Sequence, residues 1–192
     1  MIALFVYYLI VSLLIADFFT GLIHWAEDTY CIRGLSGLLG SQICEPNLLH
    51  HEDQTHFVRG KGFWSINYVV FIGSIIPFIL FVYWGLYVLA AANFISAFGN
   101  QIHAWAHRKP RWVTPLLLQE MAILQTPHQH ARHHKKPHNK CYCTVTNWLN
   151  PPLDRLYFWR GLEKLIYWIS FKKVRPRPLI QEKNDESITR EL

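Results

Sequence analysis

The chain has 192 residues, 51% of them hydrophobic, and it carries 12 Phe, 9 Tyr and 8 Trp. This length suits one compact domain, and the clustering of apolar residues into long uncharged runs is typical of a membrane protein. The net charge of +6 indicates an anionic partner, either a membrane surface or a nucleic acid. Four Cys are too few for a disulfide scaffold, and we expect them to be reduced packing residues.

The first apolar segment covers residues 1–23, which contain no Lys or Arg and one acid, Asp17. A signal peptide would begin with basic residues and end at a small-residue cleavage site, and neither feature precedes His24. We therefore expect a retained transmembrane helix of about 20 residues.

The second apolar segment, residues 63–99, contains no charged residue. About 20 residues cross the hydrocarbon core, so this segment is too long for one span. It divides near Tyr83, Trp84 and Gly85 into a hairpin of two spans, in which Pro77 is tolerated as a kink. The sequence thus predicts an all-α integral membrane protein with about three transmembrane helices.

This topology places every histidine on one side of the membrane or at its edge. Of the 19 Lys and Arg, three lie between residues 24 and 63 and sixteen follow residue 103. None lies in residues 1–23 or at the tip of the hairpin. By the positive-inside rule, the histidine face is predicted to be cytoplasmic, in a bacterial inner membrane or the endoplasmic reticulum.

Two later segments are predicted to be interfacial. Residues 112–124 are apolar but too short to span and are interrupted by Pro115. Residues 152–171 form an amphipathic pattern, which fits a helix on the lipid headgroups or a helix packed on the domain. We place the membrane domain at residues 1–171 and a flexible polar tail at residues 172–192.

Histidines recur at spacings that bring side chains together on helices. His103 and His107 are four residues apart and share a face, as do His24 and Asp28. The sequence HARHH is expected to put three imidazoles on one face: His130, His133 and His134. The adjacent pair His50 and His51 would point about 100° apart on a helix, which suits two metal ions better than one. His138 follows the last group.

One such pair is more often a surface accident than a metal site, but four groups on one membrane face predict a centre with several metals. About ten ligand candidates exceed what a single tetrahedral zinc needs. Imidazole suits zinc, copper, iron and nickel alike, so the location decides: beside lipid chains, an unactivated C–H bond needs a strong oxidant, which two iron ions with O2 can generate. His56 and His128 fit no group.

Basic residues interleave the last histidine group: Arg132, Lys135, Lys136 and Lys140. Such a patch fits anionic lipid or nucleic acid, and the three predicted spans favour lipid. We therefore expect no nucleic-acid partner.

The ordered motifs HW-x-x-D-T, HH, NQIHAWAH and QHARHH-x-x-P with CYC, followed by WLNPPLD and FWRGLE, resemble the Kua/CarF lipid desaturases over residues 16–164. That family includes plasmanylethanolamine desaturases and a plant plastid palmitate desaturase. The resemblance implies a membrane oxidoreductase with two Fe ions, O2 as co-substrate, a phospholipid substrate and an electron donor such as ferredoxin or cytochrome b5. It assigns metal binding to these residues: His24, His50, His51, His103, His107, His130, His133 and His134, with Asp28 as ligand or orienting residue and His138 ranked lower.

The sequence leaves the substrate open. NQIH, WLN-x-PL and FWR-x-LE resemble the plasmanyl branch, whereas HAWAH and VRPRP resemble the acyl branch. Formation of a vinyl ether is favoured, with acyl desaturation or hydroxylation as the alternatives. Many relatives have a further histidine where this chain reads RGKGF, and whether His56 substitutes for it is open. A non-enzymatic metal-binding protein or transporter would need more polar residues within the spans.

Overall fold

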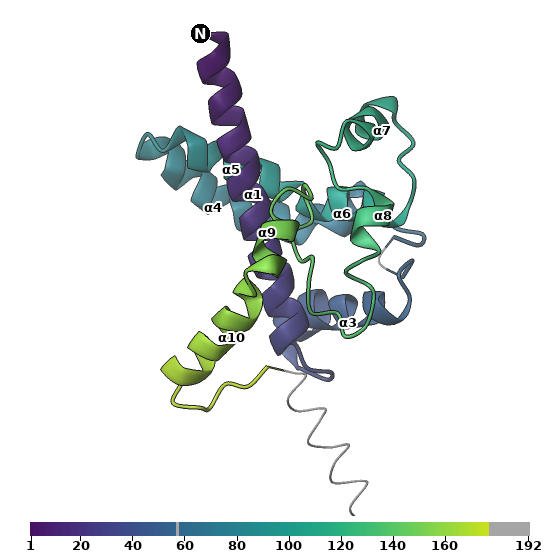
Figure 1. The fold of residues 1–192 in the computed structure, drawn as a ribbon. Helices are drawn as coiled ribbons and strands as arrows, with labels where there is room; N and C mark the ends of the chain where they lie inside the picture. The colour runs from purple at the N-terminus through teal and green to yellow at the C-terminus, as the bar shows by residue number, and fades with distance from the viewer. Residues whose placement is uncertain (57, 177–192) are drawn as a thin grey trace, which may run out of the picture.

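The computed structural model describes residues 1–56 and 58–176, and every regular element in that part of the chain is helical (Figure 1). The elements are α1 (Ile2–Tyr30), α2 (Gly37–Leu39), a π-helical turn η1 (Gly40–Cys44), α3 (Glu45–Glu52), α4 (Phe63–Tyr83), α5 (Tyr87–Ala97), α6 (Gly99–His107), α7 (Val113–Glu120), α8 (Pro127–His130), α9 (Asn150–Arg155) and α10 (Phe158–Ile169). The all-α prediction is confirmed for the described residues. Most of the predicted tail lies outside them.

Helix α1 has 29 residues and a length of about 44 Å at 1.5 Å per residue. Residues 1–10 are exposed and almost wholly apolar. The buried face begins at Ser12 and continues through Ala16, Asp17, Gly21 and His24. Small residues dominate this face, so neighbouring segments approach the helix closely. This close packing continues as far as His24, where the polar site begins.

Helices α4 and α5 form the predicted hairpin. Helix α4 ends at Tyr83 and α5 begins at Tyr87, with Gly85 at a positive φ of 69° in the turn between them. Helices α1 and α4 are long and apolar enough to cross a membrane. The third expected span is not one helix, because α5 has 11 residues, about 16 Å, before a bend at Phe98 separates it from α6. A count of three spans therefore stays a prediction.

Three hydrogen bonds define how these helices lie along one another. The Ser12 hydroxyl of α1 donates to the Val88 carbonyl, beside the hairpin tip (84–86). At the opposite end, the Asn67 amide donates to Gln101, and the Asn100 amide donates to the Ile66 carbonyl. We call this opposite end the histidine end, because His103 follows directly on α6.

An irregular segment, residues 141–147, packs against the middle of α1. The carboxylate of Asp17 accepts hydrogen bonds from the backbone N–H groups of Val145 and Thr146 and from the Thr146 hydroxyl, at 2.7 to 3.1 Å. Farther along α1, Trp25 packs against Tyr142 and Trp159 in a buried cluster. The segment is thereby fixed to α1 on both sides of His24.

The region predicted as one amphipathic helix, residues 152–171, is divided between α9 and α10 at Tyr157, whose φ is 53°. One face of α10 buries Trp159 and Glu163, and Glu163 accepts a hydrogen bond from the Trp25 indole of α1. Leu165, Trp168 and Ile169 are exposed. The helix therefore packs on the domain and keeps an exposed apolar face. In the other interfacial segment, Pro115 lies in the first turn of α7, where proline is tolerated, rather than interrupting a helix.

The expectation of four reduced cysteines is wrong for two of them. Cys31 and Cys44 form a disulfide that joins the end of α1 to η1, just before α3. Sequence spacing did not predict it, because the pairing depends on the turn that folds residues 32–43 back onto α1. Cys141 and Cys143 are buried free thiols, as expected of packing residues. Burial raises the pKa of the Cys141 thiol to about 11, so this side chain stays protonated.

Candidate metal centre

Four segments supply the histidines of the centre: the C-terminal part of α1, helices α3 and α6, and the segment that begins with α8. Figure 1 shows α3, α6 and α8 gathered beside the C-terminal half of α1. Helix α8 begins with a capping box, in which Thr126 and Gln129 each bond the backbone N–H of the other. This cap fixes the start of the last histidine segment.

Five histidines form a first group, which we call the five-histidine cluster: His50, His103, His107, His130 and His134. Their Nε2 atoms face one another. The atom of His103 lies 2.9 Å from that of His130 and 3.0 Å from that of His107, and His107 and His130 are also 3.0 Å apart. His134 adds contacts of 3.0 Å to His130 and 3.1 Å to His50.

A second group, the mixed cluster, contains His24, Asp28, His51 and His133. The carboxylate of Asp28 lies at its middle. Its Oδ2 atom is 3.1 Å from Nε2 of His133 and 3.8 Å from Nε2 of His24, and its Oδ1 atom is 2.8 Å from Nε2 of His51. The Asn47 amide donates to the same Oδ1 at 2.7 Å, which orients the carboxylate.

Adjacent histidines divide between the two clusters. His50 lies in the five-histidine cluster and His51 in the mixed cluster. His134 and His133 divide in the same way. The expectation that His130, His133 and His134 share one face is therefore wrong, because α8 ends at His130 and the chain continues as turns. The clusters adjoin, with the rings of His24 and His103 5.2 Å apart between centroids.

Backbone carbonyls hold the orientation of three of these rings. Nδ1 of His24 donates to the Tyr142 carbonyl, Nδ1 of His50 to the Asn47 carbonyl, and Nδ1 of His133 to the Lys140 carbonyl. When Nδ1 carries the proton, the Nε2 lone pair is left to bind a metal. All three Nε2 atoms point into their cluster.

The donor atoms fit metal ions better than they fit one another. In the mixed cluster, three buried atoms converge without a hydrogen bond among the described residues: His24 Nε2, Asp28 Oδ2 and His133 Nε2. In the five-histidine cluster, the Nε2 atoms of His103, His107 and His130 all contact one another, and three neutral rings cannot satisfy all three contacts with hydrogen bonds because each Nε2 is either a donor or an acceptor. Ligands at right angles, about 2.1 Å from one ion, lie about 3.0 Å apart, close to the observed separations.

The protonation of the buried histidines agrees with this arrangement. Burial, reinforced by neighbouring imidazoles, holds the pKa of His50 and of His130 well below its ordinary value. The same causes lower the pKa of His107 to about 4. These rings are therefore neutral at physiological pH, and neutral imidazole is the form that binds metals.

The three remaining histidines lie outside both clusters, and only His138 of these was a predicted ligand. His138 is half-buried, with its ring 4.7 Å from that of His51, but Nε2 donates to the His134 carbonyl. His56 and His128 are exposed. The sequence reading missed Asn47, which orients Asp28, although its position one helical turn before His50 and His51 was a usable signal.

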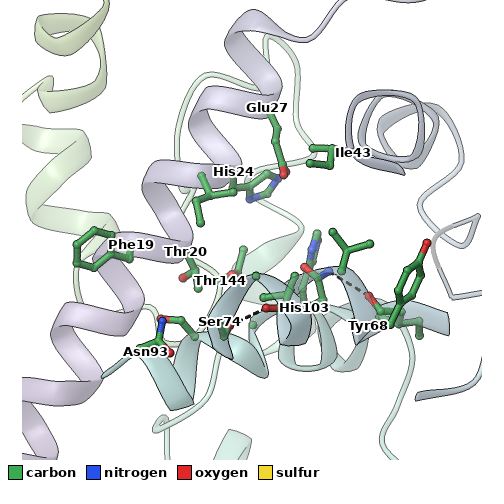
Figure 2. A pocket seen from close by; sticks show the side chains of 18 of the residues that line it. Phe19, Thr20, His24, Glu27, Ile43, Tyr68, Ser74, Asn93, His103 and Thr144 are labelled. Carbon is green, nitrogen blue, oxygen red and sulfur yellow. Dashed lines mark hydrogen bonds between the residues drawn. The ribbon is translucent and has the colours of Figure 1, made fainter. Parts of the chain in front are cut away.

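A cavity of about 630 Å³ opens beside the two clusters, between α1, α4 and α5 (Figure 2). His24 from α1 and His103 from α6 extend from its walls toward each other. Away from the histidines the lining is mostly apolar, and it includes Ile15, Pro77 and Phe81. The cavity thus joins the metal-binding region to the interior of the hydrophobic hairpin.

Fold and site together define a helical protein with two membrane-length apolar helices and two adjoining histidine-rich groups that could each hold a metal ion. A family model for the lipid desaturase domain matches residues 13–178. The chain therefore belongs to the lipid desaturase family.

Curated relatives agree with that assignment. The chain is 33% identical to plasmanylethanolamine desaturase 1 of Mus musculus over 180 residues, which covers 84% of this chain and 65% of the mouse protein. It is 30% identical to plasmanylethanolamine desaturase of Myxococcus xanthus, covering 81% of this chain and 58% of that protein. It is 31% identical to fatty acid desaturase 4, chloroplastic, of Arabidopsis thaliana, covering 90% of this chain and 54% of that protein. No solved structure matches the chain.

Proposed function

We propose that the protein is an O2-dependent di-iron desaturase that forms the vinyl-ether double bond of plasmalogens from plasmanyl phospholipid. The observation that carries this proposal is the pair of adjoining ligand clusters beside an apolar cavity. The relatives named plasmanylethanolamine desaturase favour the ether substrate. The substrate is drawn from the bilayer, and the histidine face is proposed to be cytoplasmic.

Iron is proposed on chemical grounds. Five imidazoles in one cluster exceed the four ligands of a structural zinc, and a hydrolytic zinc uses about three protein ligands. Imidazole with a carboxylate also suits iron. The five-histidine cluster would hold one ion and the mixed cluster the other, and together with O2 they would supply the oxidising power that an unactivated C–H bond demands.

The overall reaction removes one hydrogen from each of the first two carbons of the alkyl chain, next to the ether oxygen, and leaves a double bond between them. O2 is reduced to two water molecules. Two electrons and two protons complete the balance, and the electrons come from a donor such as ferredoxin or cytochrome b5. This donor is a required partner of the proposed activity.

The chain's own residues position the reactants. Tyr142, Asn47 and Lys140 hold three imidazoles through their backbone carbonyls, so that the Nε2 atoms stay directed into the clusters. Apolar walls beside His24 and His103 exclude water and admit hydrocarbon. Exclusion of water protects an oxidising centre from side reactions.

Expression in an aerobic host that lacks plasmalogens, fed an alkyl-ether precursor, tests the proposal. We expect acid-labile chains that release aldehydes, in a yield that depends on O2. His103→Ala should abolish the product because it removes a ligand at the centre of the five-histidine cluster. His128→Ala is the matched control, because this histidine is exposed and outside both clusters.

Acyl-lipid desaturation is the second candidate, favoured by the Arabidopsis relative and by HAWAH and VRPRP in the sequence. New unsaturated fatty acids without aldehydes would reject the vinyl ether and retain the desaturase. Hydroxylated lipid in place of either product would instead assign a hydroxylase with the same centre.

A further inference from the structure

The cavity has two chemically different ends. The histidine end of the lining carries polar side chains, which include Lys61, Gln42 and Tyr68, and the Tyr68 hydroxyl donates to Gln42. Toward the hairpin tip the lining is apolar, with Pro77, Phe81 and Leu89 among its residues. The hydrogen bonds Asn67–Gln101 and Ser12–Val88 establish that these ends lie at opposite limits of the helices.

We propose that this cavity is the substrate groove, in which one hydrocarbon chain of a phospholipid lies between α1, α4 and α5. The phosphate end lies against Lys61, and the tail runs toward Phe81 and Leu89. This inference rests on the proposed function, because it identifies how that activity takes its substrate.

Dimensions favour a hydrocarbon chain. From Ser65 to Phe81 the wall formed by α4 is about 24 Å long at 1.5 Å per residue. One lipid chain crosses one leaflet, about half of the 30 Å hydrocarbon core, so the groove is long enough to hold it. The volume of about 630 Å³ is that of a site for one chain rather than for a whole phospholipid.

The charged residues of the lining indicate which end of the lipid lies at the histidine end of the groove. Among the described residues that line the groove, Lys61 is the one Lys or Arg, and it is half-buried at the histidine end; Glu27, beside His24, is the one acidic residue of the lining, so Lys61 is the position that can hold a phosphate. A phosphate there gains an ion pair in a partly desolvated setting, where charges interact more strongly than in water. The reverse orientation would bury a phosphate beside Phe81 and Leu89 without a cation.

Gly73 offers a way to block the groove without disturbing the centre. It lines the groove on α4, and a Cβ added there would meet no described atom within 4 Å. A larger side chain therefore occupies space that the lipid needs. Gly161 of α10 is the matched control, because it is also helical, exposed and free of neighbours within 4 Å but lies outside the groove.

Photo-crosslinking of the purified full chain in nanodiscs tests the groove. The probe is a phosphatidylethanolamine with a diazirine at the middle of one chain, and labelled residues are mapped by mass spectrometry. We expect labels on the groove side of α4, at Val70, Gly73 and Pro77, in excess over the exposed Ile72 and Ile76. Gly73→Phe should lower the groove labels about tenfold, a loss of ~1.4 kcal/mol of binding, whereas Gly161→Phe should not.

Lys61→Glu should move labels along α4 or abolish them, because it replaces attraction of the phosphate by repulsion. Iron content is measured for every variant and should equal that of the parent chain. Labels confined to Ile72, Ile76 and the first ten residues of α1, or unchanged groove labels in Gly73→Phe, would overturn the groove. These readouts do not depend on turnover, so a failure of the groove and a failure of the desaturase proposal are distinguishable.

Discussion

At the scale of single residues, the backbone carbonyls that accept from His24, His50 and His133 are as informative as the ligand candidates themselves. Each bond fixes a tautomer and a ring orientation before any metal arrives. Because the acceptors are main-chain atoms, substitution of the residues that carry them leaves the bonds in place. The side chain of Asn47 is the exception, since its amide also orients Asp28.

The division into clusters predicts how metal is lost on substitution. His133→Ala removes a ligand of the mixed cluster and is expected to lower bound iron from about two ions per chain to about one. His107→Ala should do the same at the five-histidine cluster. His138→Ala should retain more iron than either, because Nε2 of His138 is engaged by the His134 carbonyl.

Iron per chain, measured by elemental analysis of protein purified with iron, checks this prediction. His128→Ala is the control and should match the parent chain. Equal losses in His128→Ala and His133→Ala would contradict the distinction between ligands and exposed histidines.

At the scale of elements, the junction between α1 and residues 141–147 determines where His24 lies. Gly21 occupies the point of closest approach: an added Cβ would lie 2.7 Å from the Cys143 sulfur and 3.1 Å from its backbone N and Cα atoms. The backbone of residue 143 is itself held, because its N–H donates to Asn150 and its carbonyl accepts from Gln125 and Asn150. Neither side can retreat without breaking hydrogen bonds.

Gly21→Ala is therefore predicted to destabilise the protein by about 1–3 kcal/mol through overpacking. Gly161→Ala, at an exposed helical site with open space, should be neutral or stabilising by up to about 1 kcal/mol. Thermal unfolding in detergent measures both. A Gly21→Ala variant as stable as the parent chain would mean that α1 and residues 141–147 can separate freely.

Much of the candidate centre was predictable because histidine spacing is a local property of the sequence. The hairpin break at Tyr83 to Gly85 and the His103–His107 pair are of this kind. The assignment of His50 and His51 to different clusters also followed from their helical angle. The assignment of His133 to the mixed cluster could not be predicted in this way, because it depends on where α8 ends. The Cys31–Cys44 disulfide could not be predicted either, because it depends on a turn that no periodicity encodes.

At the scale of the whole molecule, two signals disagree about which face of the membrane carries the centre. Sixteen of the 19 Lys and Arg follow residue 103, which by the positive-inside rule favours a cytoplasmic histidine face. The disulfide between Cys31 and Cys44 lies on the same side, directly after α1, and disulfides are rare in the cytosol. The charge distribution involves many residues, whereas the disulfide is a single bond, so we give the charge distribution more weight.

We therefore expect the centre to face the cytoplasm. A membrane-impermeant thiol reagent applied to intact cells should label a cysteine placed at Gly85 and leave one at Lys140 protected. The parent chain measures the background, which should be low because Cys31 and Cys44 are paired and Cys141 and Cys143 are buried. Labelling of the Lys140 site with the Gly85 site protected would reverse the orientation, because the centre would then face the outside and the electron donor would have to act from that side.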